Sequence, residues 1–285
     1  MEIWDRITSI SRKGLAAIRL LGSQGPEKDV AKHWLFRTGS RLDRKFAATA
    51  PYSFSDYGDF ERITIYDQTF LWPRNGPKAS ALQILSEIMT PTHPHQYLYG
   101  PTMVGIDDVV LDIGACEGAF SALVTARCKR VVAVEPSRSM CRLIVELFQL
   151  RNEPCPQILN CLLGSESGKA YFLENARNPG ASRITSGPVP GAYEVPVMTI
   201  DEAVEMMEDK PTFIKCDAEG AEIKIFSGGK HFLQQFHPKL AITTYHNPKD
   251  FADLHALLKS FGYRVEGKGF LYAGDALRVQ MIHAW

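Results

Sequence analysis

A glycine-containing turn follows the first strongly apolar segment of the chain. Residues 109–113 read VVLDI, and from Asp112 the sequence continues as D-x-G-x-x-x-G, with Gly114 and Gly118 as its glycines. Glycines directly after a strand let a ligand approach the backbone closely. A dinucleotide-binding loop would also need glycine at positions 116 and 119, where the sequence has cysteine and alanine. The pattern therefore favours a ligand other than a nicotinamide dinucleotide.

Two carboxylates near this turn suit different ends of one ligand. Asp112 lies two residues before the first glycine, where a negative charge repels a pyrophosphate but suits a cationic amino-acid group. Glu135 ends the second apolar segment, where a carboxylate can accept hydrogen bonds from both hydroxyls of a ribose. A cationic amino-acid end and a ribose together predict S-adenosylmethionine as the ligand. The alternatives are two structural acids beside a turn glycine, or NAD.

The candidate catalytic residues follow the fourth and fifth apolar segments. A hydroxyl acceptor must lose its proton, and histidine has the pKa best suited to remove it near neutral pH. His246 is therefore the first candidate base, with a loop hydrogen bond or a substrate contact as its alternative role. Asp217 would contact the methionine end of the ligand or orient the nucleophile, and Glu219 would act as a second base or cap a helix. Lys215 would face the same side of the strand as Asp217, or pair with these carboxylates.

A divalent metal is a further alternative for this group. Held by Asp217, Glu219 and His246, it would lower the pKa of a bound hydroxyl. No compact ligand spacing in the sequence supports such a site, so no metal ligand is predicted.

Strand and helix patterns alternate from residue 109 onward, which is typical of βαβ units and a parallel sheet. Two further strands at the end have no helix between them, which predicts an antiparallel hairpin. The predicted fold is therefore an α/β, Rossmann-like sheet of seven strands. The expected helices are 119–128, 138–151, 250–261 and one that begins at a capping box of Thr199 and Glu202. The expected strands are 109–113, 130–135, 157–163, 213–217, 240–245, 263–266 and 277–283.

One internal segment lacks both patterns. Residues 174–194 are rich in Asn, Pro, Gly and Ser, which predicts a long loop without secondary structure. Loops of that length inside a compact domain are often functional.

Residues 1–100 predict a mostly helical extension to a ligand-binding domain formed by 101–285. An amphipathic helix over 3–21 would pack on its own domain or on the partner chain of a homodimer, or lie on an anionic membrane surface. For the whole extension a lid, a dimer surface and acceptor contacts are the alternatives. Its other expected elements are a helix near 28–37, a hairpin of 62–66 with 69–72, a helix over 78–89, and a linker over 91–105 in which His93 and His95 are turn residues beside Pro94.

Opposite charges balance over the whole chain but not along it. The 32 basic and 32 acidic residues give no net charge, which argues against a nucleic-acid partner. Residues 1–50 carry ten basic and five acidic side chains, so this end is +5 and the remainder −5. No apolar run approaches the roughly 18 residues of a membrane span, and no signal peptide is recognised. The six cysteines form no C-x-x-C pair, so we expect free thiols in a cytoplasmic protein.

Several stretches resemble the FkbM family of S-adenosylmethionine-dependent methyltransferases, and the resemblance covers 109–265. The turn 112–120 resembles the family's D-x-G-A-N-x-G-x-F, with Cys116 in place of asparagine. The run 214–222 resembles I-K-I-D-x-E-G-x-E, the most family-specific motif. The stretch 162–168 resembles A-L-S-D-x-x-G, with Ser165 in place of the acid. The other matched stretches are 134–136, 180–182, 197–201 and 245–250.

The resemblance implies a class I methyltransferase fold and S-adenosylmethionine as the cofactor. It also implies O-methylation of a hydroxyl on a small-molecule or glycan acceptor. Transfer to nitrogen or to a protein side chain, and a binding module without turnover, are the alternatives. The residues expected to contact the cofactor are Asp112, Gly114, Ala115, Cys116, Gly118, Phe120, Glu135, Pro136, Ser137, Leu163, Ser165 and Asp217.

Overall fold

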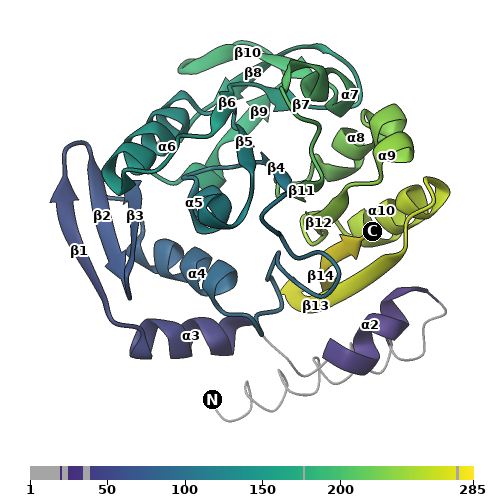
Figure 1. Ribbon diagram of the computed structural model, residues 1–285, viewed down its shortest axis with the longest axis horizontal. Coiled ribbons are helices and arrows are strands. Elements are labelled where there is room, and N and C mark those ends of the chain that lie inside the picture. Colours follow the sequence, from purple (N-terminus) through teal and green to yellow (C-terminus); the bar gives the residue numbers. More distant parts are fainter. Residues whose placement is uncertain (1–19, 21–24, 35–38, 176, 274–275) are drawn as a thin grey trace.

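The largest sheet of the protein has seven strands, as predicted. A computed structural model describes residues 20, 25–34, 39–175, 177–273 and 276–285. The strands of this sheet are β4 (Val109–Ile113), β5 (Arg130–Val134), β6 (Gln157–Leu159), β11 (Phe213–Cys216), β12 (Lys239–Thr243), β13 (Val265–Ala273) and β14 (Ala276–Ala284). Their order is β13-β14-β12-β11-β4-β5-β6 (Figure 1). Neighbouring strands from β12 to β6 pair in parallel, whereas β14 is antiparallel to both β12 and β13. The predicted terminal antiparallel hairpin is confirmed.

Side chains of β4 alternate between two hydrophobic cores, one on each face of the sheet. Val109, Leu111 and Ile113 belong to the first core, and Val110 belongs to the second. This period of two is the geometry of a strand, and burial on both faces explains the continuous apolar run. Helices of the first core are α8 (Glu222–Ser227), α9 (Lys230–Phe236) and α10 (Asp250–Ser260), and those of the second are α5 (Ala119–Val124) and α6 (Arg138–Arg151).

The first hundred residues extend both cores. Phe70 and Leu85 lie in the second core together with Phe213 of β11, while Val30 and Trp34 lie in the first. The predicted hairpin is part of a three-stranded antiparallel sheet, because a third strand precedes it. That strand reads YSFSDY and is mostly exposed; its aromatic residues alternate with serines, but the sequence-based prediction did not include it. The elements are α2 (Glu27–Trp34), α3 (Gly39–Thr49), β1 (Tyr52–Tyr57), β2 (Phe60–Ile65), β3 (Gln68–Pro73) and α4 (Lys78–Met89).

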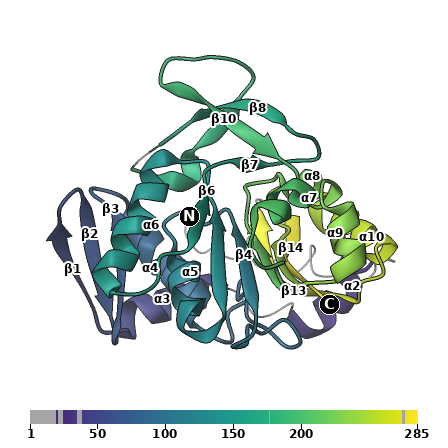
Figure 2. The same cartoon turned by 45° about the horizontal axis from the view of Figure 1, so that its top comes forward.

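A second, four-stranded sheet replaces two sequence-based expectations. Its strands are β7 (Leu162–Leu163), β8 (Gly168–Leu173), β9 (Arg183–Thr185) and β10 (Ala192–Met198), in the order β7-β10-β8-β9. The expected strand 157–163 therefore divides between the two sheets, and the expected structureless loop 174–194 contains β9, the short helix η2 (Pro179–Ala181) and the start of β10. Both of these predictions were wrong: the chain leaves the large sheet after Leu159, β9 has only three residues that are mostly exposed, and β10 contains a proline. Figure 2 shows this sheet above the large one.

Short helical turns complete the chain. Thr199 caps α7 (Ile200–Ala203) by accepting a hydrogen bond from the Glu202 amide, which confirms the predicted capping box. The other turns are η1 (Thr125–Arg127) and η3 (Val204–Met206).

The segment predicted as a linker is fixed by hydrogen bonds from Lys268, a buried lysine of β13. Lys268 has no exposed surface and donates hydrogen bonds to the carbonyl oxygens of His93, Pro94 and Gln96 at 2.5, 2.9 and 3.3 Å. Burial lowers the pKa of Lys268 to about 7. The turn that carries His93 and His95 is thus fixed against the carboxyl-terminal hairpin.

The amphipathic helix predicted over 3–21 lies outside the described residues, apart from Leu20. No helix in the described part of the chain is both long and apolar enough to cross a membrane.

Because residues 39–89 share a hydrophobic core with the large sheet, we expect the protein to unfold in one cooperative transition. Phe70 is 1% exposed, and its replacement by alanine removes a buried ring, so we expect Phe70→Ala to lower the free energy of unfolding by about 3–5 kcal/mol. Urea unfolding followed by far-UV circular dichroism and by tryptophan fluorescence should give one shared transition at a lower midpoint. The control Ile106→Ala changes a side chain that is 68% exposed and should move the stability by no more than about 0.5 kcal/mol. A separate, earlier transition for residues 39–89 would contradict this prediction.

Candidate functional site

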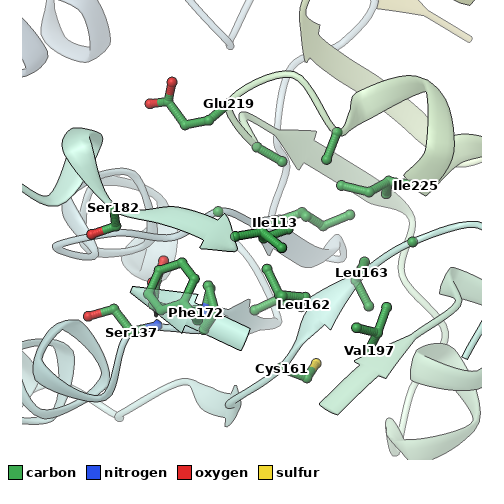
Figure 3. A pocket seen from close by; sticks show the side chains of 18 of the residues that line it. Ile113, Ser137, Cys161, Leu162, Leu163, Phe172, Ser182, Val197, Glu219 and Ile225 are labelled. Carbon is green, nitrogen blue, oxygen red and sulfur yellow. Dashed lines mark hydrogen bonds between the residues drawn. The ribbon is translucent and has the colours of Figure 1, made fainter. Parts of the chain in front are cut away.

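A cavity of about 540 Å³, here the first cavity, opens at the carboxyl ends of β4, β5 and β11 (Figure 3). Ligands bind at this edge in open parallel sheets. One wall is apolar and includes Leu162, Phe172 and Val197, which Figure 3 shows close together. The sequence-predicted residues that line this cavity are Gly114, Cys116, Glu135, Pro136, Ser137, Leu163, Ser165 and Asp217.

Gly114 and Gly118, the glycines of the turn after β4, are each required by a different close contact. Gly114 has a φ of 70°, and a Cβ there would lie 1.9 Å from the carbonyl oxygen of Asp217. Only glycine lets the ends of β4 and β11 approach so closely. Gly118 begins α5 with a φ of 75°, where a Cβ would lie 2.9 Å from Ile144. Gly118 does not line the first cavity, so its role is to pack the helix rather than to contact a ligand directly.

Glu135 ties the first two strand ends together. Its carboxylate accepts hydrogen bonds from the backbone amides of Cys116 and Ser137, both at 2.8 Å. Burial raises the pKa of Glu135 to about 7. Cys116 has a φ of 51°, a left-handed conformation that suits asparagine better than most residues. This backbone would suit the asparagine that the resemblance led us to expect here, and cysteine adopts the same conformation.

Asp112 faces a cation of its own chain. It is fully buried, its Oδ1 lies 3.0 Å from the Lys215 ammonium, and its Oδ2 accepts a hydrogen bond from Ser121 at 2.7 Å. Lys215 also donates to the carbonyl oxygens of Gly114 and Ile113, at 2.6 and 3.3 Å. Asp112 does not line the first cavity, so the expected direct contact with a cationic ligand end is replaced by this ion pair. Burial opposes protonation of Lys215, but Asp112 and Asp217 more than compensate and raise its pKa.

A second cavity of about 280 Å³ adjoins the first. Both are lined by Gly114, Cys116, Gly180, Asp217 and Glu219, so these residues mark the junction. The rest of the second cavity is largely built by residues 72–97, which belong to the amino-terminal extension. Its polar and aromatic lining residues include Trp72, Glu87, His95, Tyr97, Glu117, Asn178, Lys215 and Tyr245. Two predicted cofactor residues, Ala115 and Phe120, line this cavity instead of the first.

Asp217 stands at the junction as a carboxylate. It accepts hydrogen bonds from the Tyr97 hydroxyl at 2.7 Å and the Thr243 hydroxyl at 3.1 Å. Burial alone would raise the pKa of Asp217, but the charges of His95, Lys215 and His246 lower it below its usual value. A stable negative charge is therefore present where the two cavities meet.

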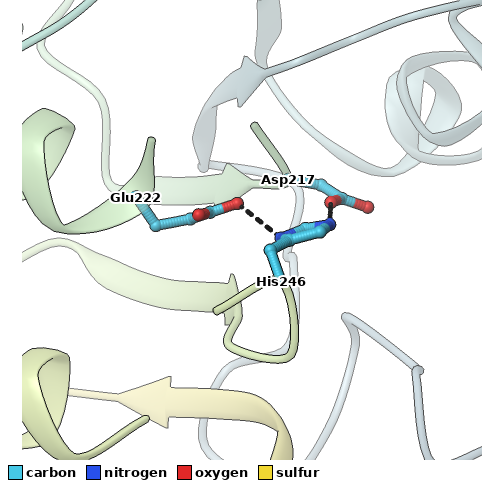
Figure 4. Close-up of side chains that lie close together, drawn as sticks. All are labelled: Asp217, Glu222 and His246. Atoms are coloured by element: carbon cyan, nitrogen blue, oxygen red, sulfur yellow. Dashed lines mark ion pairs between the residues drawn. The ribbon is translucent and has the colours of Figure 1, made fainter. Parts of the chain in front are cut away.

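His246, the predicted base, is surrounded by carboxylates. Its Nδ1 lies 3.0 Å from Glu222, and its Nε2 lies 3.6 Å from Asp217 (Figure 4). The same Nε2 lies 3.4 Å from Glu219. Burial lowers its pKa, yet these three carboxylates raise the pKa of His246 to about 9. The ring is then an imidazolium at neutral pH, the opposite of the state a general base requires, and it lines neither cavity. The geometry makes His246 the cation that holds Glu222 and Asp217 in place.

The same group also forms the one cluster with metal-ligand spacing in the described residues. Ligand atoms of Asp217, Glu222 and His246 lie within 4.8 Å of one another, with Glu222 in place of the Glu219 considered from the sequence. An imidazolium has no free lone pair, so a metal would bind here only after His246 loses a proton.

Sequence reasoning missed three polar side chains at the junction. Glu87 of α4 lies 2.8 Å from His95 Nδ1, and His95 Nε2 lies 3.5 Å from the Tyr97 hydroxyl and 3.9 Å from Asp217. His95 and Tyr97 were assigned to a linker, whereas both are buried at the site. The one available signal was a His-Pro-His-Gln-Tyr stretch between two structured segments, and polar residues in a turn are not specific enough to indicate catalysis.

The ion pairs of His246 predict a pH-dependent stability. His246→Gln leaves Glu222, which has no exposed surface, without its cation, and we expect a loss of about 3 kcal/mol at pH 7. A folded-state pKa of about 9 against an ordinary value of 6.5 means that this stabilisation is complete below pH 6.5 and is lost as the pH rises through about 9. Urea unfolding at several pH values should show the gap between wild type and variant closing over that range. The exposed His231→Gln serves as the control, and a gap that widens with pH would argue against these ion pairs.

Comparison with known proteins places the chain in one family. Residues 112–265 match the family described as the methyltransferase FkbM domain, and no curated protein matches the chain. A crystal structure of methyltransferase FkbM from Methylobacillus flagellatus KT is 20% identical, with a TM-score of 0.49, over 74% of this chain and 56% of that one. This chain thus spans only a little over half of the length of that protein.

Two other solved structures are similar at lower identity. A putative methyltransferase from Streptococcus mutans in complex with SAH is 11% identical, covering 64% of this chain and 91% of that chain, with a TM-score of 0.41. TYW2 from M. jannaschii in complex with AdoMet is 13% identical, covering 81% and 87%, with a TM-score of 0.42. The family match itself includes the turn after β4, the end of β5 and the junction carboxylate, and it spans more than half of the sequence. The chain therefore belongs to the FkbM methyltransferase domain family.

Proposed function

We propose that this protein transfers a methyl group from S-adenosylmethionine to a hydroxyl group of a small-molecule or glycan acceptor. One observation carries the proposal: two cavities of different character meet at the ionised Asp217. A donor in the first cavity and an acceptor in the second would face each other at that point. Methyl transfer depends mainly on such placement, with the reacting atoms held in line about 3–3.5 Å apart.

The first cavity fits S-adenosylmethionine residue by residue. Glu135 lines it and has lone pairs left after its two backbone contacts, as a ribose diol requires. The apolar wall that includes Leu163 and Phe172 offers a surface for the adenine ring. Gly114 lines the cavity beside Asp217, and its backbone would face the methionine portion. When bound, the cofactor supplies a methyl carbon that is already electrophilic because it is attached to a sulfonium centre.

Hydroxyl methylation is favoured by what the protein provides around the acceptor. A hydroxyl is a weak nucleophile until its proton is taken, and the junction contains the Asp217 carboxylate with the His95 ring 3.9 Å from it. The chain's own contributions are therefore to hold both molecules, exclude water from the junction and accept one proton.

Removal of the ribose acceptor should weaken cofactor binding. Glu135→Ala deletes hydrogen bonds to a charged group, worth roughly 1.5–3 kcal/mol, so we expect the S-adenosylmethionine Kd to rise roughly 10- to 100-fold. Isothermal titration calorimetry measures this change. The control Glu194→Ala removes an exposed carboxylate of β10 that does not line the first cavity and should leave the Kd unchanged. Tighter binding of NAD than of S-adenosylmethionine would refute the proposed function.

The raised pKa of Glu135 also predicts a pH effect on binding. Below about 7 the carboxyl group of the free protein is protonated and offers ribose a weaker acceptor. The Kd of S-adenosylmethionine should therefore increase as the pH falls from 8 through about 7 to lower values. Titrations across this range should show this pH dependence of the Kd in the wild type but not in Glu135→Ala. An equal pH dependence in both proteins would exclude Glu135 as its cause.

A further inference from the structure

The second cavity combines residues of the matched family domain with residues that precede it. Trp72, Glu87, His95 and Tyr97 all precede residue 112, where that match begins. These four side chains belong to the amino-terminal extension and add polar and aromatic groups to the junction residues. An acceptor role for this cavity rests on the proposed function, because it concerns the acceptor side of the same reaction.

Glu87 and His95 form a buried dyad on one wall of this cavity. Glu87 Oε2 lies 2.8 Å from His95 Nδ1, which directs the other ring nitrogen, Nε2, toward Tyr97 and Asp217 at the junction. A carboxylate on Nδ1 fixes the orientation of the ring and makes Nε2 the atom that exchanges protons. The turn that carries His95 is held by Lys268, so the dyad has a rigid support.

The cationic groups of the cavity are already paired. Lys215 has three N–H donors, and Asp112, Gly114 and Ile113 accept them. The His95 ring pairs with Glu87. The acidic residues that line the cavity are Glu87, Glu117, Asp217 and Glu219. A phosphorylated or carboxylated acceptor would therefore meet carboxylates without a free cation among the described lining residues.

Three buried polar atoms of the lining residues have no hydrogen-bond partner among the described residues. One of them, His95 Nδ1, lies 2.8 Å from the Glu87 carboxylate. The other two are the indole Nε1 of Trp72 and the Oε2 of Glu117, and both side chains are almost fully buried. Buried polar groups normally have partners, so these two indicate a polar ligand. A hydroxyl group can accept from the indole and donate to the carboxylate, and an uncharged polyol or phenol supplies such groups without added charge.

We propose that the second cavity binds an uncharged, hydroxyl-bearing acceptor, and that His95, oriented by Glu87, takes the proton from the hydroxyl that is methylated. The acceptor's O–H bond breaks and its proton passes to His95 Nε2. The oxygen's electron pair forms the new O–CH₃ bond as the S–CH₃ bond breaks, and the sulfur leaves as a neutral thioether. The imidazolium formed is stabilised by Glu87 and Asp217, and it then loses the proton to water.

The first test locates the acceptor and its charge. The protein is saturated with S-adenosylhomocysteine and titrated with matched pairs of neutral and anionic compounds, such as methyl β-D-glucopyranoside and its 6-phosphate, or phenols and their carboxylated counterparts. The readout is the indole N–H resonance of Trp72, assigned with Trp72→Phe. We expect neutral members to shift it and to bind at least roughly tenfold more tightly than their anionic partners. Tighter binding of the anionic members, or no shift with any compound, would overturn the acceptor assignment.

The second test uses the best neutral binder as the methyl acceptor. His95→Gln should lower kcat roughly 10²- to 10⁴-fold, while the S-adenosylmethionine Kd and the acceptor KM stay within about twofold. His93→Gln is the matched control, because His93 is equally buried in the same turn but lines neither cavity. Its ring contacts the His95 backbone amide at 3.0 Å and Asp43 at 3.2 Å, not the His95 side chain. The kcat of this variant should stay close to that of the wild type.

The pH profile separates proton transfer from a structural role. The groups that face His95 are Glu87, Asp217, Tyr97, Tyr245 and, at longer range, Lys268. Burial lowers the pKa of His95, but Glu87 and Asp217 raise it above its ordinary value of 6.5, so kcat should fall as the pH drops through that raised value. Glu87→Gln should move this acid limb to lower pH.

Three outcomes would reject the base assignment while leaving the cofactor site intact. They are an unchanged kcat in His95→Gln, an acid limb that Glu87→Gln does not move, and a loss of kcat in His246→Gln that His95→Gln does not share. Failure of the wild type to bind S-adenosylmethionine would instead reject the proposed function itself.

Discussion

The ammonium group of Lys215 is the contact on which the site depends. It joins β11 to the turn after β4 by pairing with Asp112 and by donating to the Ile113 and Gly114 carbonyls. A buried ion pair stabilises a fold only when its geometry is good and its remaining donors are satisfied, and all three donors are satisfied here. Because the turn is held there, the Cys116 amide can reach Glu135, and Gly114 can touch the carbonyl of Asp217.

Charges around Asp217 follow a common plan. Three groups that can carry a positive charge lie around this carboxylate, and each has another carboxylate as its nearer or stronger partner: Lys215 with Asp112, His246 with Glu222, and His95 with Glu87. Together they lower the pKa of Asp217, which therefore keeps its negative charge. The Lys215 pair shapes the turn after β4, the His246 pair lies at the start of α8, and the His95 pair lies on the wall of the second cavity.

The sequence predicted the fully buried strands well. It predicted the less buried strands, and the contacts between residues far apart in the chain, poorly. The strand at 109–113 is mostly apolar, as a sheet covered on both faces requires, and the glycine turn that follows it located the first cavity. The three-residue strand β9 is mostly exposed, and β10 contains Pro196, so neither gave a clear strand pattern. Asp112 was recognised as important, but a sequence cannot show that its partner is Lys215, a hundred residues away. His95 was missed because one of its neighbours, Asp217, is likewise distant in the sequence, and because a histidine beside a proline reads as a turn residue.

The insertion of β14 between β12 and β13 has a consequence for how the protein is made. Residues 276–284 join the hairpin to the parallel part of the large sheet, and Lys268 on the adjoining strand supports the turn that carries His95. While the ribosome is still translating or enclosing these residues, the nascent chain holds every residue that lines the two cavities, but β12 exposes an unpaired edge. Such an edge is prone to pairing with other chains. Chaperone contact and aggregation of this polypeptide should therefore concentrate in the interval between the emergence of β12 and that of β14 from the ribosome.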